Sequence, residues 1–359
     1  MSGAEFGAQR KRKRSIAARL IWLFPLLIPV AAWYMVQRVS GTPLSSHLEK
    51  PDHSVVAAGT PKARTPHIAA RSSPTRTAPK RFDPSLNAPL PGHRIVAVYG
   101  IVYGVEGNGY ASSVQMLRGF LPQLNQLSRQ YSALDPTHPV LQGVDLVVNP
   151  LKPCSVAPRW CNLYAHPATM QAYVNFCRTH HLLLFLDLQL GTEPVRDAVM
   201  HHILPYLTKY PFTELALDTE FHFPNTPAGY ADARNYPCCL GWMGAGEINW
   251  TERELASISV RYHLPRKVLV IHQWSQSVIR GKNYIRFNPN VSLVIQSDGW
   301  GSTFDKLTDY TNFVQKSLVE YGGYKLFLPH LYDTDTDVPL QTPQQVMQLF
   351  PQPLFVSYQ

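Results

Sequence analysis

Eight short apolar segments follow residue 93 and alternate with longer amphipathic segments, and this repetition restricts the fold more than any other feature. Strands that are apolar at nearly every position are typical of a parallel sheet covered by helices on both faces. Eight of them in about 265 residues match the size of a (β/α)8 barrel. A doubly wound open sheet is the alternative, but its glycine-rich phosphate-binding sequence does not follow the first strand. The predicted strands are 94–100, 140–148, 182–188, 214–220, 267–273, 291–298, 323–328 and 353–358.

The segments between these strands predict the helices of the barrel. The interval 275–286 is short and is expected to hold only a turn. Helices are predicted near 113–131, 167–180, 194–208, 251–263, 303–320 and 342–350, so that 94–359 forms one barrel domain.

Polar side chains collect at the carboxyl ends of the predicted strands, where (β/α)8 barrels place their active sites. The segment 214-ELALDTEFHF-223 is the clearest case, because Asp218, Glu220 and His222 alternate and would share one face of a strand. Carboxylates crowded in a barrel mouth raise one another's pKa, so that one can hold a proton while another stays ionised. Hydrolysis of a glycosidic bond needs such a pair. The predicted catalytic residues are Glu220, Asp218, Asp187, His272 and Asp298.

Aromatic and polar side chains near the same strand ends are the candidates for substrate binding. The long segment 221–250 is rich in aromatic residues, and Trp274 and Trp300 follow the fifth and sixth strands. Such rings could stack on the faces of sugars. The predicted substrate-binding residues are Tyr99, Gln189, His222, Gln273, Trp274, Trp300 and Tyr332.

The stretch 217-LDTE-220 resembles the fourth-strand motif of barrel-type lysozymes (muramidases) and the last part of the chitinase motif. This resemblance implies that Glu220 is the general acid and that Asp218 assists it. The sequence departs from the chitinase pattern at position 216, which is alanine rather than aspartate, and in lacking Asp-x-Ser on the first strand. The segments 185-FLDLQLG-191, 217-LDTEF-221, 270-VIHQW-274 and 297-SDGWGS-302 resemble a group of uncharacterised exported bacterial proteins, which implies export but no particular activity.

Two other function classes remain open at the level of sequence. A metal-dependent barrel, of the sugar-isomerase or lyase kind, could use Glu220, His272, Asp298 and Asp187 as ligands. The chain contains no His-x-His and no His-Glu-x-x-His, so a zinc hydrolase of a familiar kind is not expected. For the preferred hydrolase we predict no metal and no cofactor. A non-catalytic carbohydrate-binding or envelope-scaffolding barrel is the other class, because 325-KLFLPHLYD-333 on the seventh strand brings no second catalytic carboxylate to the strand end.

The sequence of the N-terminal quarter of the chain predicts a membrane anchor. Residues 1–19 are basic, and the apolar segment 20–37 is just long enough to span a bilayer, with Trp22 and Trp33 near its ends. Residues 38–93 are proline-rich and without apolar periodicity, as in a disordered linker. We expect a single-pass protein of the cell membrane with its barrel on the extracytoplasmic side; a cleaved signal peptide is the alternative.

The charge distribution bears on the partners. Residues 1–94 hold 15 Lys and Arg against 4 Asp and Glu, a net charge of +11, whereas the rest of the chain holds 18 against 20, a net of −2. A basic nucleic-acid-binding surface on the barrel is therefore not predicted. The expected partners are a polysaccharide or another envelope polymer, and the membrane through the N-terminal helix.

The cysteines fit an exported chain, in which disulfides are permitted. Cys154 and Cys161 lie in the loop after the second strand, and Cys238 and Cys239 lie in the loop after the fourth. We expect a Cys154–Cys161 bridge, or a bridge from that loop to Cys238 or Cys239. Cys177 lies on an amphipathic segment and is expected to be a buried free thiol.

Overall fold

The structure is a computed structural model and describes residues 88–101, 110–236, 239–317, 319–329 and 336–359. The described residues all belong to one compact unit, Pro79–Gln359. The predicted segments 1–19 and 20–37, and nearly all of 38–93, lie outside them. Within the described ranges, none of the helices has the length and apolar character needed to cross a bilayer.

Eight parallel strands form a closed barrel, which confirms the predicted (β/α)8-type architecture and excludes the open sheet. Around the barrel the order is β1-β10-β9-β8-β6-β4-β3-β2, and every pairing is parallel. A separate two-stranded sheet pairs β5 (Met243–Gly244) with β7 (Ile279–Arg280). The barrel strands are β1 (Arg94–Ile101), β2 (Val140–Val147), β3 (Leu183–Leu188), β4 (Thr213–Asp218), β6 (Lys267–Gln273), β8 (Val291–Ser297), β9 (Tyr321–Leu326) and β10 (Phe355–Tyr358).

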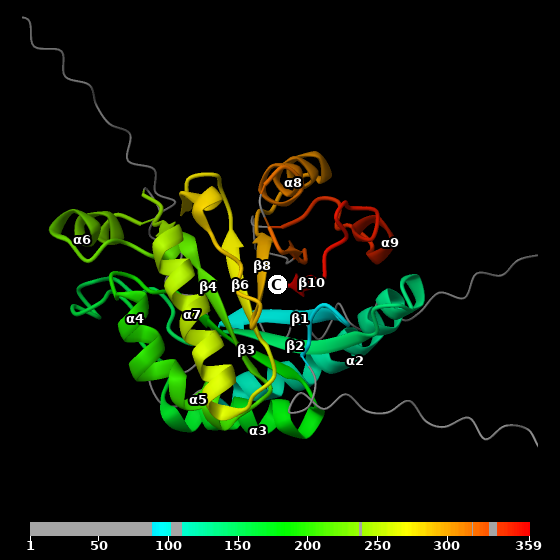
Figure 1. Cartoon of the computed structure of the whole chain (residues 1–359), viewed down its shortest axis with the longest axis horizontal. Coiled ribbons are helices and arrows are strands. Elements are labelled where there is room, and N and C mark those ends of the chain that lie inside the picture. The colour runs from blue at the N-terminus through cyan, green and yellow to red at the C-terminus, as the bar shows by residue number, and fades with distance from the viewer. Residues whose placement is uncertain (1–87, 102–109, 237–238, 318, 330–335) are drawn as a thin grey trace, which may run out of the picture. The chain divides into compact units, whose positions relative to one another are not determined.

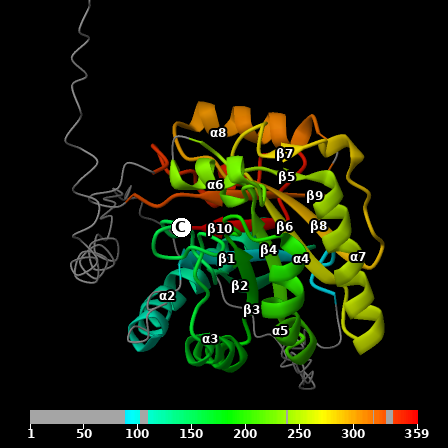
Figure 2. The ribbon, with the colours of Figure 1, turned by 90° about the vertical axis from the view of Figure 1, so that its left-hand side faces the viewer.

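Helices surround the strands, as Figures 1 and 2 show from two directions. Between β6 and β8, residues 274–290 form β7 and the 3-10 turn Lys282–Tyr284 rather than an α-helix, as predicted for this short interval. A π-helical turn, Val199–Ile203, joins α4 to α5, and a second, Thr311–Gln315, extends α8. The α-helices are α2 (Tyr110–Leu134), α3 (Pro167–His180), α4 (Val195–Ala198), α5 (Leu204–Lys209), α6 (Pro227–Arg234), α7 (Ala245–Tyr262), α8 (Thr303–Tyr310) and α9 (Pro343–Val346).

Local sequence signals set where several helices begin. At the start of α8, the Ser302 hydroxyl oxygen accepts a hydrogen bond from the backbone N–H of Asp305, and the Asp305 carboxylate accepts one from the backbone N–H of Ser302. Thr342 and Thr226 cap α9 and α6 in a similar way, and a proline follows each threonine at the first helical position. These residues satisfy amide groups that a helix start otherwise leaves without partners.

The barrel interior is filled by apolar side chains. Leu183, Phe185 and Val270 belong to a buried cluster inside the strands, separate from the larger apolar layer between strands and helices. Phe185 packs edge-on against Phe355, with ring centroids 5.0 Å apart. Gly143 lies beside Phe185, and a Cβ atom added at Gly143 would be in van der Waals contact with that ring at 3.4 Å. The lower part of the barrel is therefore an apolar plug, as expected for a barrel of eight strands.

The loops after β2, β3 and β4 are tied to one another. A disulfide joins Cys154 to Cys161, as expected, so neither is available to Cys239; Cys238 lies outside the described residues. The amide of Gly191 donates to the Phe221 carbonyl oxygen at 2.8 Å, and its own carbonyl oxygen accepts from Phe223 at 2.7 Å. Cys177 is a buried free thiol, and burial raises its pKa.

Candidate active site

One residue layer above the apolar plug, the inward side chains of the strands become polar. Strands alternate their side chains, so each of these residues follows an inward plug residue by two positions. Asp145 follows Gly143, Asp187 follows Phe185, and His272 follows Val270. We call this layer the polar ring; it consists of Tyr99, Asp145, Asp187, Asp218, His272, Gln296, Lys325 and Ser357, all of them buried.

Lys325 and Asp298 form an ion pair at the upper edge of the polar ring. Lys325 Nζ lies 3.0 Å from Asp298 Oδ1, and His272 Nδ1 lies 2.8 Å from Asp298 Oδ2. The Lys325 ammonium also lies over the ring of Tyr99, 3.4 Å from its centroid. Asp298 therefore has two cationic or proton-donating partners, and the buried Lys325 charge has both an anion and an aromatic face.

Asp218 and Glu220 come from the end of β4 and the 3-10 turn that follows it. Asp218 Oδ2 accepts hydrogen bonds from Tyr99 Oη at 3.4 Å and from Gln189 Nε2 at 3.2 Å. Glu220 is partly exposed, and its Oε2 atom is buried without a hydrogen-bond partner among the described residues. Glu220 is thus a residue at the edge of the cluster that is partly exposed while its carboxyl group keeps a buried acceptor oxygen without a partner among the described residues.

Burial raises the pKa of most carboxyl groups in the cluster. It brings the pKa of Asp145 to about 6 and that of Asp187 to about 7. Burial and then the neighbouring Asp187 charge raise the pKa of Asp218 to about 7. The pKa of Glu220 rises well above its ordinary value, because burial and the charges of Asp218 and Asp298 all oppose its ionisation.

The cations of the cluster lower the pKa of Asp298, in contrast to the other carboxyl groups. Burial alone would raise its pKa, but Lys325 and His272 outweigh burial and lower it. Burial also opposes the charge of His272, yet the carboxylates of Asp187 and Asp298 raise the pKa of this imidazole to about 10. One mouth therefore holds carboxyl groups whose pKa values are displaced in opposite directions, a pattern found where one acid donates a proton and another remains ionised.

All five predicted catalytic residues lie in this cluster, but the strand face predicted for His222 is wrong. The alternation stops at Asp218, because the hydroxyl of Thr219 donates to the His272 carbonyl oxygen and the chain enters a 3-10 turn. His222 is thereby turned to Glu247 at the start of α7, with Nε2 2.8 Å from Oε1.

The other predicted substrate-binding residues lie in different places. Tyr99 and Gln189 contact Asp218, and Trp274 stacks on Trp300 with centroids 5.1 Å apart. Gln273 faces away from the ring, because its position in β6 alternates with His272; its Oε1 accepts from Lys282 Nζ at 2.6 Å. Tyr332 lies outside the described residues.

The site residues predicted from the sequence did not include Asp145 and Lys325. Both could have been identified from strand alternation, since Asp145 lies within the apolar run 140–148 and Lys325 within 323–328. Among the described residues, two sets have ligand atoms within 4.8 Å of one another, as a metal site requires: Asp145, Asp187 and His272, and Asp218, His272 and Asp298. Glu220, which the sequence-based ligand set included, is in neither.

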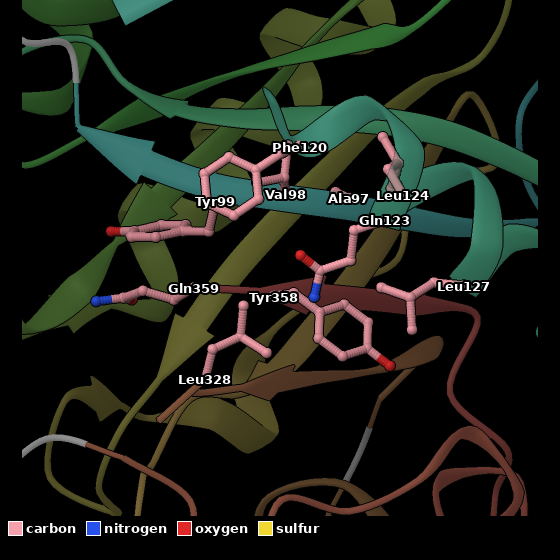
Figure 3. A pocket seen from close by; sticks show the side chains of 10 residues that line it. All are labelled: Ala97, Val98, Tyr99, Phe120, Gln123, Leu124, Leu127, Leu328, Tyr358 and Gln359. Atoms are coloured by element: carbon pink, nitrogen blue, oxygen red, sulfur yellow. The ribbon is translucent and has the colours of Figure 1, made fainter. Parts of the chain in front are cut away.

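A small cavity of about 30 Å³ lies beside the cluster, between α2 and the strands β1 and β10. Figure 3 shows Tyr99 at one side of it, with the hydroxyl directed away from Leu124 and Leu127. That hydroxyl bonds to Asp218, so the Tyr99 ring separates the cavity from the carboxylates. The cavity has room for about one water molecule and is too small for a sugar.

No protein-family model matches the chain, and no curated protein matches it either. Among solved structures, the chain is similar to a GH10 endoxylanase retrieved from a sugarcane soil metagenome, with a TM-score of 0.26 and 11% sequence identity. The match covers 66% of this chain, which spans 59% of that xylanase chain. We base the barrel assignment on the strand pairing and not on this similarity.

Proposed function

We propose that this barrel is a glycoside hydrolase that uses Glu220 and Asp298 as carboxyl groups with different roles. One observation carries the proposal: Asp298 has Lys325 at 3.0 Å and His272 at 2.8 Å, whereas no described ion pair involves Glu220. A carboxyl between two cations stays ionised, and a carboxyl without a cation retains its proton more easily. Hydrolysis of a glycosidic bond requires one carboxyl group of each kind.

In this mechanism Glu220 donates its proton to the oxygen of the leaving sugar. Asp218 lies two residues earlier and is held in place by hydrogen bonds from Tyr99 and Gln189. It assists Glu220 because, in addition to burial, its charge raises the pKa of Glu220 and so favours the protonated acid. The ionised Asp298 stabilises the positive charge that develops on the sugar ring, or activates a water. The stacked pair Trp274 and Trp300, both partly exposed, offers an aromatic surface for a sugar.

The substrate and location that we propose come from the N-terminal sequence. A basic segment 1–19, an apolar segment 20–37 and a proline-rich segment 38–93 support a barrel tethered outside the membrane. A tethered hydrolase would act on polymers within reach of its linker. We therefore propose an envelope or environmental polysaccharide as the substrate.

The test is to incubate the purified full chain with peptidoglycan and a panel of glycans and to measure the release of reducing ends. We expect release by the wild type and a loss of about 100-fold or more in Glu220→Gln. Glu254→Gln, a matched change on the partly exposed face of α7, should keep wild-type activity.

Two results would contradict this proposal. Saturable glycan binding without any release of reducing ends would indicate a carbohydrate-binding scaffold. Equal activity of Glu220→Gln and Glu254→Gln would show that Glu220 is not a catalytic residue.

A further inference from the structure

Three side chains meet at the base of the cluster, below the Asp298–Lys325 pair. Asp145 from β2, Asp187 from β3 and His272 from β6 are all fully buried. His272 Nε2 lies 3.6 Å from Asp145 Oδ2 and 3.9 Å from Asp187 Oδ2. These separations are too long for hydrogen bonds but leave the three side chains facing a common point.

The facing atoms have no other partners. Both carboxylate oxygens of Asp145, both of Asp187 and His272 Nε2 lack a hydrogen-bond partner among the described residues. Buried polar atoms in folded proteins are nearly always satisfied, by protein, water or an ion. Three of these unsatisfied atoms, one from each residue, lie within 4.8 Å of one another, which indicates that something binds between them.

The other nitrogen of His272 identifies what binds. Nδ1 is hydrogen-bonded to Asp298, and Asp298 is in turn held by Lys325. A histidine that ligates a metal through one nitrogen usually donates its other N–H to a carboxylate, which fixes the ring and its tautomer. The alternative set is Asp218, His272 and Asp298. In that set Nδ1 of His272, the nitrogen on the Asp298 side, is already hydrogen-bonded to Asp298. The set of Asp145, Asp187 and His272, which uses the Nε2 atom that has no hydrogen-bond partner among the described residues, is therefore preferred.

We propose that Asp145, Asp187 and His272 bind one divalent transition-metal ion of the Mn²⁺ or Zn²⁺ class. Two metal–ligand bonds of roughly 2.0–2.2 Å at a tetrahedral angle place their ligand atoms about 3.4 Å apart. The observed 3.6 and 3.9 Å need only a small contraction to reach this spacing. The imidazole nitrogen favours these ions over Mg²⁺ and Ca²⁺, which prefer oxygen ligands alone. This site goes beyond the proposed hydrolase and does not depend on it.

The first test uses the full chain, purified in detergent and dialysed against EDTA, which is then titrated calorimetrically with ZnCl₂ and MnCl₂. We expect one ion per chain with a dissociation constant of about 1 µM or below for at least one of the two. Asp187→Asn and His272→Gln should each weaken binding by about 100-fold or more. Asp232→Asn, an exposed change on α6, should bind like the wild type.

A second measurement does not depend on whether the variants fold. In the Mn²⁺-loaded wild type, pulsed electron paramagnetic resonance should detect the ¹⁴N coupling of one imidazole. Absence of Mn²⁺ and Zn²⁺ binding by the wild type would overturn the proposal, as would a bound Mn²⁺ without nitrogen coupling. Unchanged affinity in folded Asp187→Asn or His272→Gln would also overturn it. Reducing-end release is scored separately, so failure of the hydrolase and failure of the metal site give different results.

Discussion

Lys325 determines how charge is distributed among the buried carboxyl groups. Its Nζ lies 3.0 Å from Asp298 Oδ1, beside the 2.8 Å contact of His272 Nδ1 with the same carboxylate, and it also lies over Tyr99. Leaving a buried charge without its partner costs several kcal/mol. A single lysine can therefore keep the carboxylate beside it ionised, while neighbouring carboxyl groups without a cation keep their protons more easily. The division of roles between Asp298 and Glu220 therefore depends strongly on Lys325, near the end of β9, acting together with His272.

Glu252 on α7 gives a pH-dependent prediction away from the site. Burial, with a contribution from the Glu320 charge, raises its pKa from 4.5 to about 7. Between these values the unfolded chain loses the proton first, so folding stability falls as pH rises from about 4.5 to 7. Glu252→Gln should remove this fall and be more stable than the wild type at pH 8 by about 1–3 kcal/mol.

Urea unfolding at pH 4 and at pH 8 checks the Glu252 prediction. The two proteins should have similar free energies of unfolding at pH 4 and differ at pH 8. A variant that is less stable than the wild type at pH 8 would show that Glu252 is ionised and favourably paired in the folded state.

At the scale of elements, the barrel strands and most helices could be predicted because their signals are local. Short, nearly continuous apolar segments marked all eight barrel strands, and the predicted helix 167–180 agrees with α3. The side-chain direction of His222 could not be predicted, since β4 ends in a 3-10 turn in which the Thr219 hydroxyl bonds to the carbonyl oxygen of His272 on the neighbouring strand β6. That contact is tertiary, and no pattern within 214–223 encodes it.

A substitution at Gly191 would measure how rigidly the loop after β3 is held. Its φ of 57° is in the left-handed region, and a Cβ atom there would lie 2.0 Å from the Trp160 carbonyl oxygen. Gly191→Ala should therefore destabilise the protein by more than about 2 kcal/mol. In Gly246→Ala on α7, a Cβ meets nothing within 4 Å, so stability should stay equal or rise by about 0.5 kcal/mol.

Thermal unfolding of both glycine variants beside the wild type makes this comparison. Similar melting temperatures for Gly191→Ala and Gly246→Ala would mean that the loop after β3 moves to accept a side chain.

At the scale of the whole molecule, the charge is divided unevenly along the chain. The N-terminal 94 residues carry a net charge of +11 and the remainder a net of −2. Excess positive charge before an apolar segment keeps the N-terminus of a membrane protein in the cytoplasm. The described, compact part of the chain begins at residue 88, close to the predicted end of the linker at 93.

Protease added to intact cells should therefore release a soluble fragment that begins between about residues 80 and 94, because proteases cut exposed linkers before compact domains. Mass spectrometry of the released material identifies the cut. A fragment that appears only after the cells are lysed would place the barrel on the cytoplasmic side and refute the proposed topology.

The apolar plug also limits the directions from which solvent and ions can reach the carboxyl groups. Phe185 and Phe355 close the barrel beneath the polar ring, and Tyr99 separates the ring from the cavity beside α2. Among the described residues, the apolar interior therefore shields the carboxyl groups from the lower end of the barrel. Contact of the cluster with solvent is then expected from the side of the strand ends, where Glu220, Trp274 and Trp300 are partly exposed.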